Sequence, residues 1–328
     1  MKFILILLVV SLPLFSEESI EKLVILGGGS AGLTSAIYAS QAGLQPLVLE
    51  GNECAGQLSA VYRMENFPGF PEGISGDELI EKMRVQANQF GARFQPGTVV
   101  DIDLKMRPFR LTLNNGQTFY SEALIIALGT AKRWIGLDSE EALKGKGVHS
   151  SAICEAPLFQ GKEVVVVGGG DAALEEALSL TEYAIRVTLI HRSNRFNASA
   201  YLQEKIFAHE KIRVIWESAV EDIYDITQDR VTGILLRNVK TQEQSLLPCD
   251  GVFVSIGRQP NTDLFKGQLE IAPSGLIVVD GHSTETSVLG VFAAGDVSDP
   301  TYRKAITAAG TGCMAAMDAI RFLSTYVP

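Results

Sequence analysis

The chain has 328 residues, of which 46% are hydrophobic and 20% are charged, and this composition describes a globular protein with a well-buried core. Its length favours about two domains. The formal net charge of −10, without any block of Lys or Arg, argues against nucleic acid as a partner. The 4 cysteines lie far apart and the 4 histidines do not pair at metal-ligand spacing, so no metal site is expected.

Residues 1–16 are predicted to be a targeting segment outside the fold. Lys2 precedes an apolar run that ends near Ser16, which is typical of a secretory signal peptide. The run is short for a membrane span, but Leu14 fits a cleavage site poorly, so an uncleaved membrane anchor is the alternative. A misassigned start codon is a third interpretation, although the next methionine, Met64, lies beyond the first glycine-rich turn. We therefore expect an exported or membrane-anchored protein, with a cytoplasmic location as the alternative.

Residues 23–50 contain the pattern of a dinucleotide-binding β-α-β unit. An apolar strand at residues 23–26 precedes a G-x-G-x-x-G turn, a helix follows at residues 31–42, and a second strand at residues 46–49 ends in Glu50. Glu50 lies about 20 residues after the turn, where an acid accepts hydrogen bonds from both hydroxyls of an unmodified ribose. Strand, turn, helix, strand and acid in this order predict dinucleotide binding far better than the glycines alone.

Each residue of the turn has a physical role in that prediction. Gly27 permits the tight turn, Gly29 lets a pyrophosphate approach the backbone, and Gly32 lets the helix pack closely against the strand. Ser30 and Ala31, at the predicted start of the helix, present free N–H groups and the positive end of the helix dipole to the phosphates.

The following segment alternates loops with short elements. Residues 51–71 read as a long loop that continues into an irregular Pro- and Gly-containing stretch. An amphipathic helix is expected at residues 77–90 and a small β-meander at residues 99–116. A buried strand at residues 123–127 ends at Gly129.

A second nucleotide unit of the same length follows, so the chain contains an internal repeat. Residues 168–173 match G-x-G-x-x-A, with Gly168 and Gly170 in the turn and with Asp171 and Ala172 at the predicted helix start.

The residue that ends the second unit differs from the acid that ends the first. The second unit closes with His191 and Arg192, and Arg195 follows. An acid here would repel a ribose 2′-phosphate, whereas arginine pairs with it in a bidentate manner. The first unit therefore suits FAD and the second suits NADPH, and ordinary surface charges remain the alternative for the two arginines.

The C-terminal part supplies a third signal. Residues 290–297 read as a strand ending in Gly295 and Asp296, and residues 302–305 open a helix. Asp296 is placed to bind a ribityl hydroxyl, and the helix N-terminus favours negative charge on a reduced flavin ring. Because this signal comes late, we expect the C-terminus to complete the first domain and the second domain to be inserted, with crossings near residues 129–132 and 256–261.

On these motifs the sequence resembles the low-molecular-weight thioredoxin reductases from about residue 22 to residue 323. The motifs are GGGSAG, GQL ahead of MENFPGFPEG, IIALGTA, VVVVGGGDAALEEAL, VTLIHR, SIGRQPNT and GVFAAGDV with YRKAITAAGTG. The resemblance implies an α/β fold of two Rossmann-like three-layer nucleotide-binding domains, the second inserted in the first and able to rotate. It implies FAD bound by residues 20–130 and 259–328, NADPH bound by residues 131–258, a homodimer, and thioredoxin as the electron acceptor.

The residues and the resemblance together define two sets of candidate contacts. Those for FAD are Gly27, Gly29, Ser30, Ala31, Gly32, Glu50, Gly56, Gln57, Leu58, Asn66, Gly129, Gly295, Asp296, Arg303, Lys304 and Ala305. Those for NADPH are Gly168, Gly170, Asp171, Ala172, His191, Arg192 and Arg195.

The catalytic motif departs from the family. The family's Cys-Ala-Thr-Cys-Asp is here 151–155, SAICE, so that Ser151 replaces the outer cysteine while Cys154 and the acid Glu155 remain. Serine forms no disulfide, so the usual relay through a cystine is closed. Cys54 is a candidate replacement only if its Cα lies within about 7 Å of that of Cys154.

Two further departures concern the cofactors. Ser193 and Asn197 occupy two arginine positions of the family's phosphate clamp, which weakens the preference for NADPH and leaves NADH as an alternative. Lys304 stands where the family commonly has glutamine beside the flavin, and its charge is expected to shift the flavin potential.

Three functions remain open from the sequence. The first is an FAD-dependent NADPH oxidoreductase of thioredoxin reductase type, in which a thioredoxin-like partner or a small disulfide or oxidant completes the exchange. The second is a single-cysteine flavin oxidase or peroxidase in which Cys154 cycles through sulfenic acid and Glu155 donates a proton, or direct electron transfer from the flavin. The third is a non-catalytic flavin-binding protein.

Overall fold

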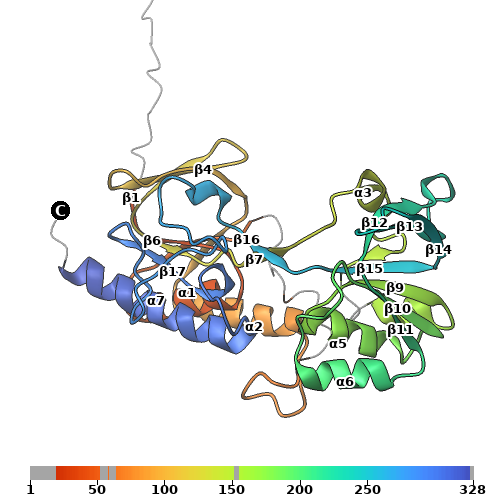
Figure 1. Ribbon diagram of the computed structural model, residues 1–328. Coiled ribbons are helices and arrows are strands. Elements are labelled where there is room, and N and C mark those ends of the chain that lie inside the picture. Colours follow the sequence, from red (N-terminus) through yellow and green to blue (C-terminus); the bar gives the residue numbers. More distant parts are fainter. Residues whose placement is uncertain (1–19, 52–57, 59–63, 151–154, 326–328) are drawn as a thin grey trace, which may run out of the picture.

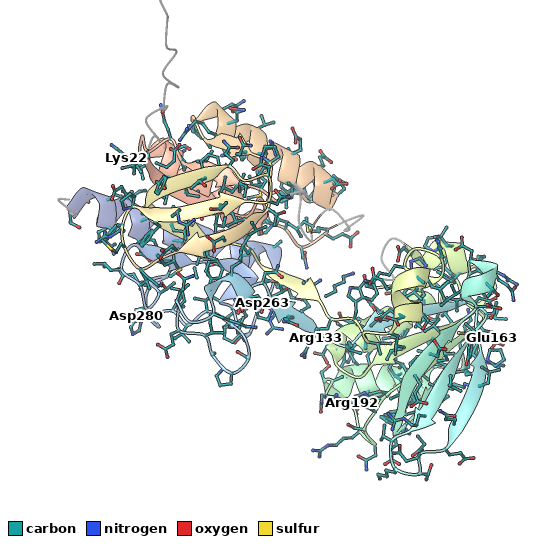
Figure 2. The ribbon with its side chains drawn as sticks, turned by 90° about the horizontal axis from the view of Figure 1, so that it is seen from above. Lys22, Arg133, Glu163, Arg192, Asp263 and Asp280 are labelled. Atoms are coloured by element: carbon teal, nitrogen blue, oxygen red, sulfur yellow. The ribbon has the colours of Figure 1, made fainter. Side chains whose placement is uncertain are left out.

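The computed structural model describes residues 20–51, 58, 64–150 and 155–325. Figure 1 shows two lobes joined by a narrow ribbon of two strands, and the view from above in Figure 2 shows the same separation, with Lys22 in one lobe and Arg192 in the other. The first lobe contains both ends of the described chain, and the second is built from the middle of the sequence.

A seven-stranded sheet forms the centre of the first lobe. The outer strands β4 and β5 run antiparallel to their neighbours, whereas β1, β2, β3, β6 and β17 are parallel. The order is β3 (Arg93–Gln95), β2 (Leu47–Leu49), β1 (Ile20–Leu26), β6 (Thr118–Ile126), β5 (Phe109–Leu113) and β4 (Val99–Asp103), with β17 (Val291–Ala293) beside the second half of β6.

Alternation along β1 explains why this sheet is covered on both faces. Leu23 and Ile25 point into a core shared with the helices α1 (Ser30–Gln41) and α7 (Ala305–Thr325). Val24 and Leu26 point into a second core on the opposite face, together with side chains of β4 and β5. A strand buried on both faces reads as a continuous apolar run, which is why LVIL was recognisable in the sequence. The helix α2 (Gly76–Gln89) packs against α1, and its N-terminus is capped by Ser75, which accepts from Glu78 N.

The second lobe repeats the same layering. Its parallel sheet has the order β11 (Ile212–Ile215), β10 (Arg186–Ile190), β9 (Glu163–Gly168), β15 (Gly251–Ser255) and β8 (Val148–His149). One face packs on α5 (Asp171–Leu180) and α6 (Ala200–Ala208), and the other packs on an antiparallel sheet of β12 (Ser218–Tyr224), β13 (Gly233–Asn238) and β14 (Gln244–Pro248). The helix α3 (Asp138–Leu143) lies beside β12.

Two short strands connect the lobes. β7 (Thr130–Lys132) leaves the first lobe and β16 (Arg258–Pro260) returns to it, and they pair antiparallel with Lys132 opposite Arg258. Short 3-10 turns complete the fold, namely η2 (Ala156–Phe159), η3 (Ile226–Gln228), η4 (Asp263–Phe265) and η5 (Gly295–Val297).

The mixed α/β fold class with parallel sheets that was predicted from the sequence is confirmed. One local expectation needs correction. The last helix begins at Ala305 rather than at Tyr302, because the preceding residues form a loop around Asp299. The sequence analysis also did not predict the antiparallel sheet β12–β14.

Among the residues that the structure describes, no helix combines the length and the apolar character needed to cross a bilayer. The predicted targeting segment, residues 1–16, lies outside the described residues.

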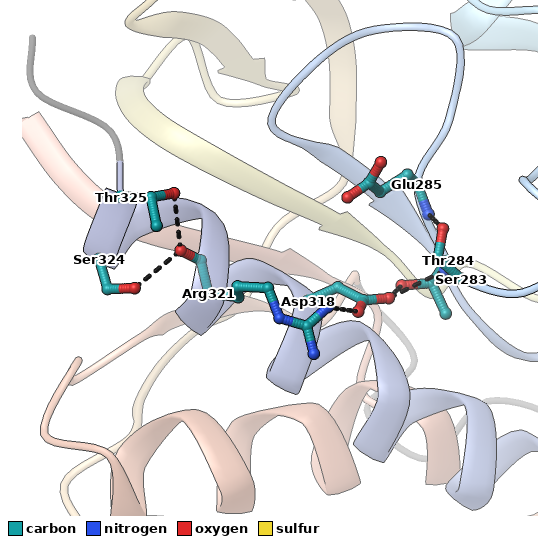
Figure 3. A network of polar contacts seen from close by, with 7 residues as sticks. All are labelled: Ser283, Thr284, Glu285, Asp318, Arg321, Ser324 and Thr325. Atoms are coloured by element: carbon teal, nitrogen blue, oxygen red, sulfur yellow. Dashed lines mark hydrogen bonds and ion pairs between the residues drawn. The ribbon is translucent and has the colours of Figure 1, made fainter.

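A buried carboxylate fastens the C-terminal helix to the lobe (Figure 3). Asp318 Oδ2 accepts hydrogen bonds from the backbone N of Thr284 at 2.9 Å and from its Oγ1 at 2.8 Å. Asp318 is only 9% exposed, whereas its other oxygen faces the largely exposed Arg321 at 3.5 Å. The two bonds to Thr284, rather than the ion pair, are therefore expected to hold α7 in place.

Replacing Asp318 tests whether its bonds to Thr284 stabilise the attachment of α7. We expect Asp318→Ala to lower the free energy of unfolding by about 1–3 kcal/mol, because it leaves two donors of Thr284 without an acceptor. The measurement is urea denaturation of the purified protein. Arg321→Ala is the matched control and is expected to change stability by less than about 0.5 kcal/mol. Equal effects of the two substitutions would contradict this account.

Candidate functional site

The first glycine turn is built so that backbone segments touch where side chains would otherwise stand. Gly27 has φ +111°, and a Cβ on it would lie 2.4 Å from the carbonyl oxygen of Ala127. A Cβ on Gly32 would lie 1.9 Å from the carbonyl oxygen of Gly27. A Cβ on Gly29, by contrast, would meet nothing within 4 Å. Two glycines are thus required by the fold itself, and Gly29 leaves open space beside the start of α1.

That open space belongs to a cavity of about 720 Å³, which is within the range of small-molecule sites. It runs from the first glycine turn along the carboxyl ends of the parallel strands to the C-terminal Gly-Asp turn. Of the candidate FAD contacts, it brings together Gly27, Gly29, Ser30, Ala31, Glu50, Leu58, Gly129, Gly295, Asp296, Arg303, Lys304 and Ala305.

The remaining candidates fall into two groups. Gly32 does not line the cavity and instead packs against Gly27, and Asn66 is exposed and lies outside the lining. Gly56 and Gln57 lie outside the described residues.

Glu50 is 6% exposed at the end of β2 and has one oxygen in use and one available. Its Oε1 accepts a hydrogen bond from Arg84 of α2, which also lies over the ring of Phe94. Its Oε2 is buried and receives no hydrogen bond from the described residues. A buried carboxylate oxygen without a donor is costly unless a ligand supplies one. A ribose hydroxyl in the cavity meets that requirement, so Glu50 fits the adenosine half of a dinucleotide.

The opposite end of the cavity is formed by the turn after β17. Gly295 has φ +77° and donates its N–H to Thr311 Oγ1, which ties the turn to α7. Burial raises the pKa of the Asp296 carboxyl, and the positive charge of Arg258 opposes that rise. A buried carboxyl at this point is a hydrogen-bond partner suited to the hydroxyls of a ribityl chain.

Asp299 shapes the loop that leads into α7. Its carboxylate accepts hydrogen bonds from the backbone N of Thr301, Tyr302 and Arg303 at 2.8, 2.9 and 2.8 Å. This loop places Arg303, in the left-handed region at φ +50°, and Lys304 on the cavity wall. A residue with φ > 0 costs free energy, and the three bonds to Asp299 offset that cost.

This end of the cavity carries an excess of positive charge. Lys132, Arg258, Arg303 and Lys304 line it, together with the carboxyl of Asp296, and the carboxylates of Asp299 and Glu176 lie close enough to act on these groups. The N-terminus of α7 begins beside them and adds its helix dipole. Cationic side chains and a helix N-terminus stabilise negative charge on a bound ring or phosphate, so the residues present fit an anionic dinucleotide such as FAD.

The second glycine turn lies in the other lobe and repeats the geometry of the first. Gly168 ends β9 with φ +157°, and a Cβ on Gly170 would meet nothing within 4 Å. Asp171 opens α5 and accepts a hydrogen bond from the backbone N of Ser199 at 2.6 Å, while Ala172 is exposed. The structure thus gives Asp171 a role in tying α5 to the segment before α6.

His191 directly follows β10 and is buried against this turn. A Cβ on Gly169 would lie 2.3 Å from its imidazole, and the ring packs edge-on to Trp216 at 6.1 Å. Burial lowers the pKa of His191, and hydrogen bonding to the backbone at Arg195 and Gly168 opposes this only in part. Its Nε2 is buried without a partner among the described residues.

Arg192 and Arg195 are both exposed in the loop after β10. The neutral imidazole and the two cations therefore stand together at the carboxyl end of β10, where an adenosine ribose with a 2′-phosphate is bound in this type of unit.

The catalytic candidates are only partly described. Ser151, Cys154 and Cys54 lie outside the described residues, so the replacement of Ser151 by Cys54 stays untested. Glu155 is described and faces His149. Burial raises the pKa of Cys249 to about 12, so this thiol is not a nucleophile at neutral pH.

Sequence reasoning missed four residues at these sites, namely Arg84, Lys132, Arg258 and His149. Arg84, Lys132 and Arg258 are brought together with their neighbours by segments distant in sequence, as when β16 places Arg258 opposite Lys132, whereas His149 meets Glu155 through local packing of β8 and η2. The only local signal was the SIGRQPNT motif, which contains Arg258.

Comparison with known proteins extends the geometry. The family model described as pyridine nucleotide-disulphide oxidoreductase matches residues 21–312. The chain is 44% identical over 304 residues to a thioredoxin reductase of Rickettsia prowazekii, covering 92% of this chain and 98% of the relative. It is 46% identical over 308 residues to a thioredoxin reductase of Streptomyces coelicolor, covering 94% and 95%.

Solved structures agree with these relatives. The thioredoxin reductase of Lactococcus lactis in the FR conformation superposes with a TM-score of 0.81 at 32% identity, covering 93% of this chain and 100% of that one. The thioredoxin reductase of T. acidophilum superposes with a TM-score of 0.76 at 31% identity, covering 92% and 97%.

The open space at Gly29 gives a test of the first cavity as a dinucleotide site. We expect Gly29→Ala to fold normally, because its Cβ meets no protein atom, and to weaken FAD binding roughly ten- to hundredfold, because the methyl group crowds the pyrophosphate. The measurement is fluorescence titration of the flavin-depleted protein with FAD. Gly310→Ala in α7, where a Cβ also meets nothing within 4 Å, is the control. Wild-type affinity in Gly29→Ala would place the pyrophosphate elsewhere.

Proposed function

The chain belongs to the pyridine nucleotide-disulphide oxidoreductase family and is an FAD-dependent enzyme of the thioredoxin reductase type, and from this premise we propose that it passes two electrons from NADPH to an external disulfide or related oxidant. The observation that carries the proposal is the cavity between the first glycine turn and the Gly-Asp turn. At one end Glu50 Oε2 has no hydrogen-bond partner among the described residues, and at the other end four cationic side chains line the cavity.

In this proposal the first lobe holds FAD. Gly29 and the N-terminus of α1 receive the pyrophosphate, Glu50 accepts from the adenosine ribose, and Asp296 binds the ribityl chain. When bound, FAD exchanges two electrons with a nicotinamide on one side and with a sulfur on the other. Lys304 and Arg303 supply positive charge that favours the reduced, anionic form.

The second lobe holds the nicotinamide nucleotide. Gly170 leaves room for its pyrophosphate, and Arg192 and Arg195 pair with the 2′-phosphate. His191, kept neutral by burial, offers a hydrogen bond without adding a third full charge. With Ser193 and Asn197 beside them, two arginines discriminate less than a larger set, so NADH is a secondary donor.

The sulfur chemistry uses one thiol. The thiolate of Cys154 attacks the external disulfide, forms one new S–S bond and releases one thiolate. Two electrons then cleave this mixed disulfide, release the second thiolate and restore Cys154. A sulfur of the external disulfide thus does the work of the cysteine that Ser151 replaces. The acceptor is a thioredoxin-like protein or a small disulfide.

Two further proposals concern assembly and location. A homodimer is supported by exposed apolar side chains on adjoining helices of the first lobe, with Tyr38 on α1 41% exposed and Met314 and Met317 on α7 44% and 49% exposed. Export or membrane anchoring is supported by the apolar run in residues 1–16 alone.

The deciding experiment separates flavin reduction from acceptor reduction. The purified yellow protein is mixed with NADPH without oxygen, and the visible flavin absorbance is followed. Rapid bleaching is expected, followed by recovery of absorbance on addition of a disulfide. Ser151→Cys, which restores the second thiol, is expected to accelerate turnover with thioredoxin. Flavin that stays oxidised, or disulfide turnover absent from both proteins, would refute the proposal.

The same samples distinguish the proposed function from that of a single-cysteine oxidase or peroxidase. Under that alternative the reduced protein recovers its absorbance with peroxide or oxygen rather than with a disulfide, and Cys154→Ser abolishes the recovery.

The role of the exposed arginines is tested by nucleotide specificity. We expect Arg192→Gln with Arg195→Gln to raise the KM for NADPH roughly ten- to hundredfold and to change the KM for NADH less than about threefold, because only NADPH carries the 2′-phosphate. Arg186→Gln is the control, since Arg186 lies at the amino end of β10, whereas His191 and the two tested arginines follow its carboxyl end. Equal increases for both nucleotides would contradict the assignment.

A further inference from the structure

The buried carboxylate of Glu50 is paired with a cation, Arg84, that the proposed function does not yet use. The side chain of Glu50 is 2% exposed, whereas that of Arg84 is 33% exposed. Arg84 Nη1 donates a hydrogen bond to Glu50 Oε1, and no other described residue forms a hydrogen bond with this carboxylate. A carboxylate that is removed from water requires a compensating charge or several hydrogen bonds. Arg84 supplies both the charge and the one hydrogen bond that Glu50 has.

The guanidinium of Arg84 rests on an aromatic ring. Its Cζ lies 4.6 Å from the centroid of the Phe94 ring, which is the distance of a cation–π contact. Phe94 belongs to β3, and β3 pairs in parallel with β2, the strand that ends just before Glu50, so that Phe94 lies opposite Val48. A planar guanidinium on a ring face donates its hydrogen bonds in defined directions. The pairing of β2 with β3 therefore fixes the direction from which the carboxylate is bound.

The helix that carries Arg84 is also fixed in place. Leu79, Ile80 and Met83 of α2 are buried in one cluster with Leu33 of α1. Because α1 begins at the first glycine turn, a single packed unit supports both the turn that faces the pyrophosphate and the arginine that holds Glu50. Arg84 does not itself line the cavity, whereas Glu50 does, so any effect of Arg84 on a ligand passes through Glu50.

We infer that Arg84 is a positioning residue for FAD. By occupying Oε1 of Glu50 it leaves Oε2 as the acceptor for the hydroxyls of an unmodified adenosine ribose, and it compensates the buried charge that this acceptor carries. The inference rests on the proposed function only in taking the first cavity as the FAD site.

The arrangement also limits the kind of ribose that the cavity accepts. A carboxylate oxygen accepts hydrogen bonds and donates none, so it suits free ribose hydroxyls. A ribose 2′-phosphate would bring further negative charge against a buried carboxylate, and the cation nearest to that carboxylate, Arg84, is already bonded to it and lies outside the cavity lining. The first lobe is therefore suited to FAD and unsuited to NADPH, in contrast to the second lobe with its exposed arginines.

The test compares the affinities of the flavin-depleted, full-length protein for FAD and for FMN, which lacks the adenosine half. Both are measured by fluorescence titration. Arg84→Met keeps an unbranched apolar side chain over Phe94 but removes the donor and the charge. Its Kd for FAD is expected to rise roughly ten- to thirtyfold, and its Kd for FMN is expected to change less than about twofold. A substitution that merely loosened the lobe would weaken the binding of both flavins.

A double-mutant cycle and a matched control complete the design. In the Glu50→Ala background, Arg84→Met is expected to change the Kd for FAD less than about twofold, because no carboxylate remains to be positioned. Arg93→Met is the control. Arg93, on β3, also donates a hydrogen bond to a glutamate, Glu21, but neither residue lines the cavity. Its Kd for FAD is expected to stay within about twofold of the wild-type value.

Arg84→Lys serves if Arg84→Met does not fold. Lysine keeps the charge but lacks the planar guanidinium, so a rise of roughly three- to tenfold in the Kd for FAD is expected from it. The inference is overturned if a folded variant at position 84 binds FAD as tightly as the wild type, if FAD and FMN lose affinity by the same factor, or if the loss is as large without Glu50. The titrations need neither NADPH nor an acceptor. Such a result is therefore distinct from a wild-type flavin that NADPH does not bleach, which would refute the proposed function instead.

Discussion

The architecture depends on the close approach of helix α1 to backbone on two sides. A Cβ on Gly32 would strike the carbonyl oxygen of Gly27 at 1.9 Å, and a Cβ on Gly312 would strike that of Ala31 at 2.2 Å. Ser35 Oγ adds a bond across the second contact, lying 2.8 Å from the carbonyl oxygen of Gly312. At both contacts backbone packs directly against backbone without an intervening side chain, so a shift of α1 toward either neighbour would cause a steric clash. The C-terminal helix is thereby built into the first nucleotide unit, and a cavity closed by both ends of the chain follows from that packing.

Local patterns predicted the parts of the site that depend on short-range geometry. The glycine turns, Glu50 and the Gly-Asp turn were recognisable because each combines a strand end with a residue type that the backbone geometry there requires. Arg84 and His149 were not, since their partners are distant in sequence or set by packing: Arg84 reaches Glu50 from a helix 34 residues later. The antiparallel sheet β12–β14 was missed because its strands mix exposed polar and apolar residues with little regular alternation.

The loss of the outer cysteine changes what the rest of the catalytic segment must do. With Ser151 in its place, Cys154 cannot rest as an intrachain cystine with its family partner, so its ionisation is governed by its surroundings. The carboxylate that follows it would suppress the thiolate on its own. The imidazole of His149 contacts Glu155, and the rings of Phe159 and Phe253 that pack on it hold β8 and η2 together at this point.

The ribbon between the lobes places two cations directly opposite each other. Lys132 and Arg258 are paired across β7 and β16, and like charges in this position repel. Lys132 donates a hydrogen bond to Ser150 of the second lobe. Burial lowers the pKa of Arg258, and the negative charges of Asp296 in the first lobe and Glu176 in the second oppose this lowering. Both cations line the cavity, so an anionic ligand there relieves their repulsion. The ribbon that joins the lobes therefore carries two cations that an anionic ligand in the cavity would stabilise, although the chain as a whole is acidic.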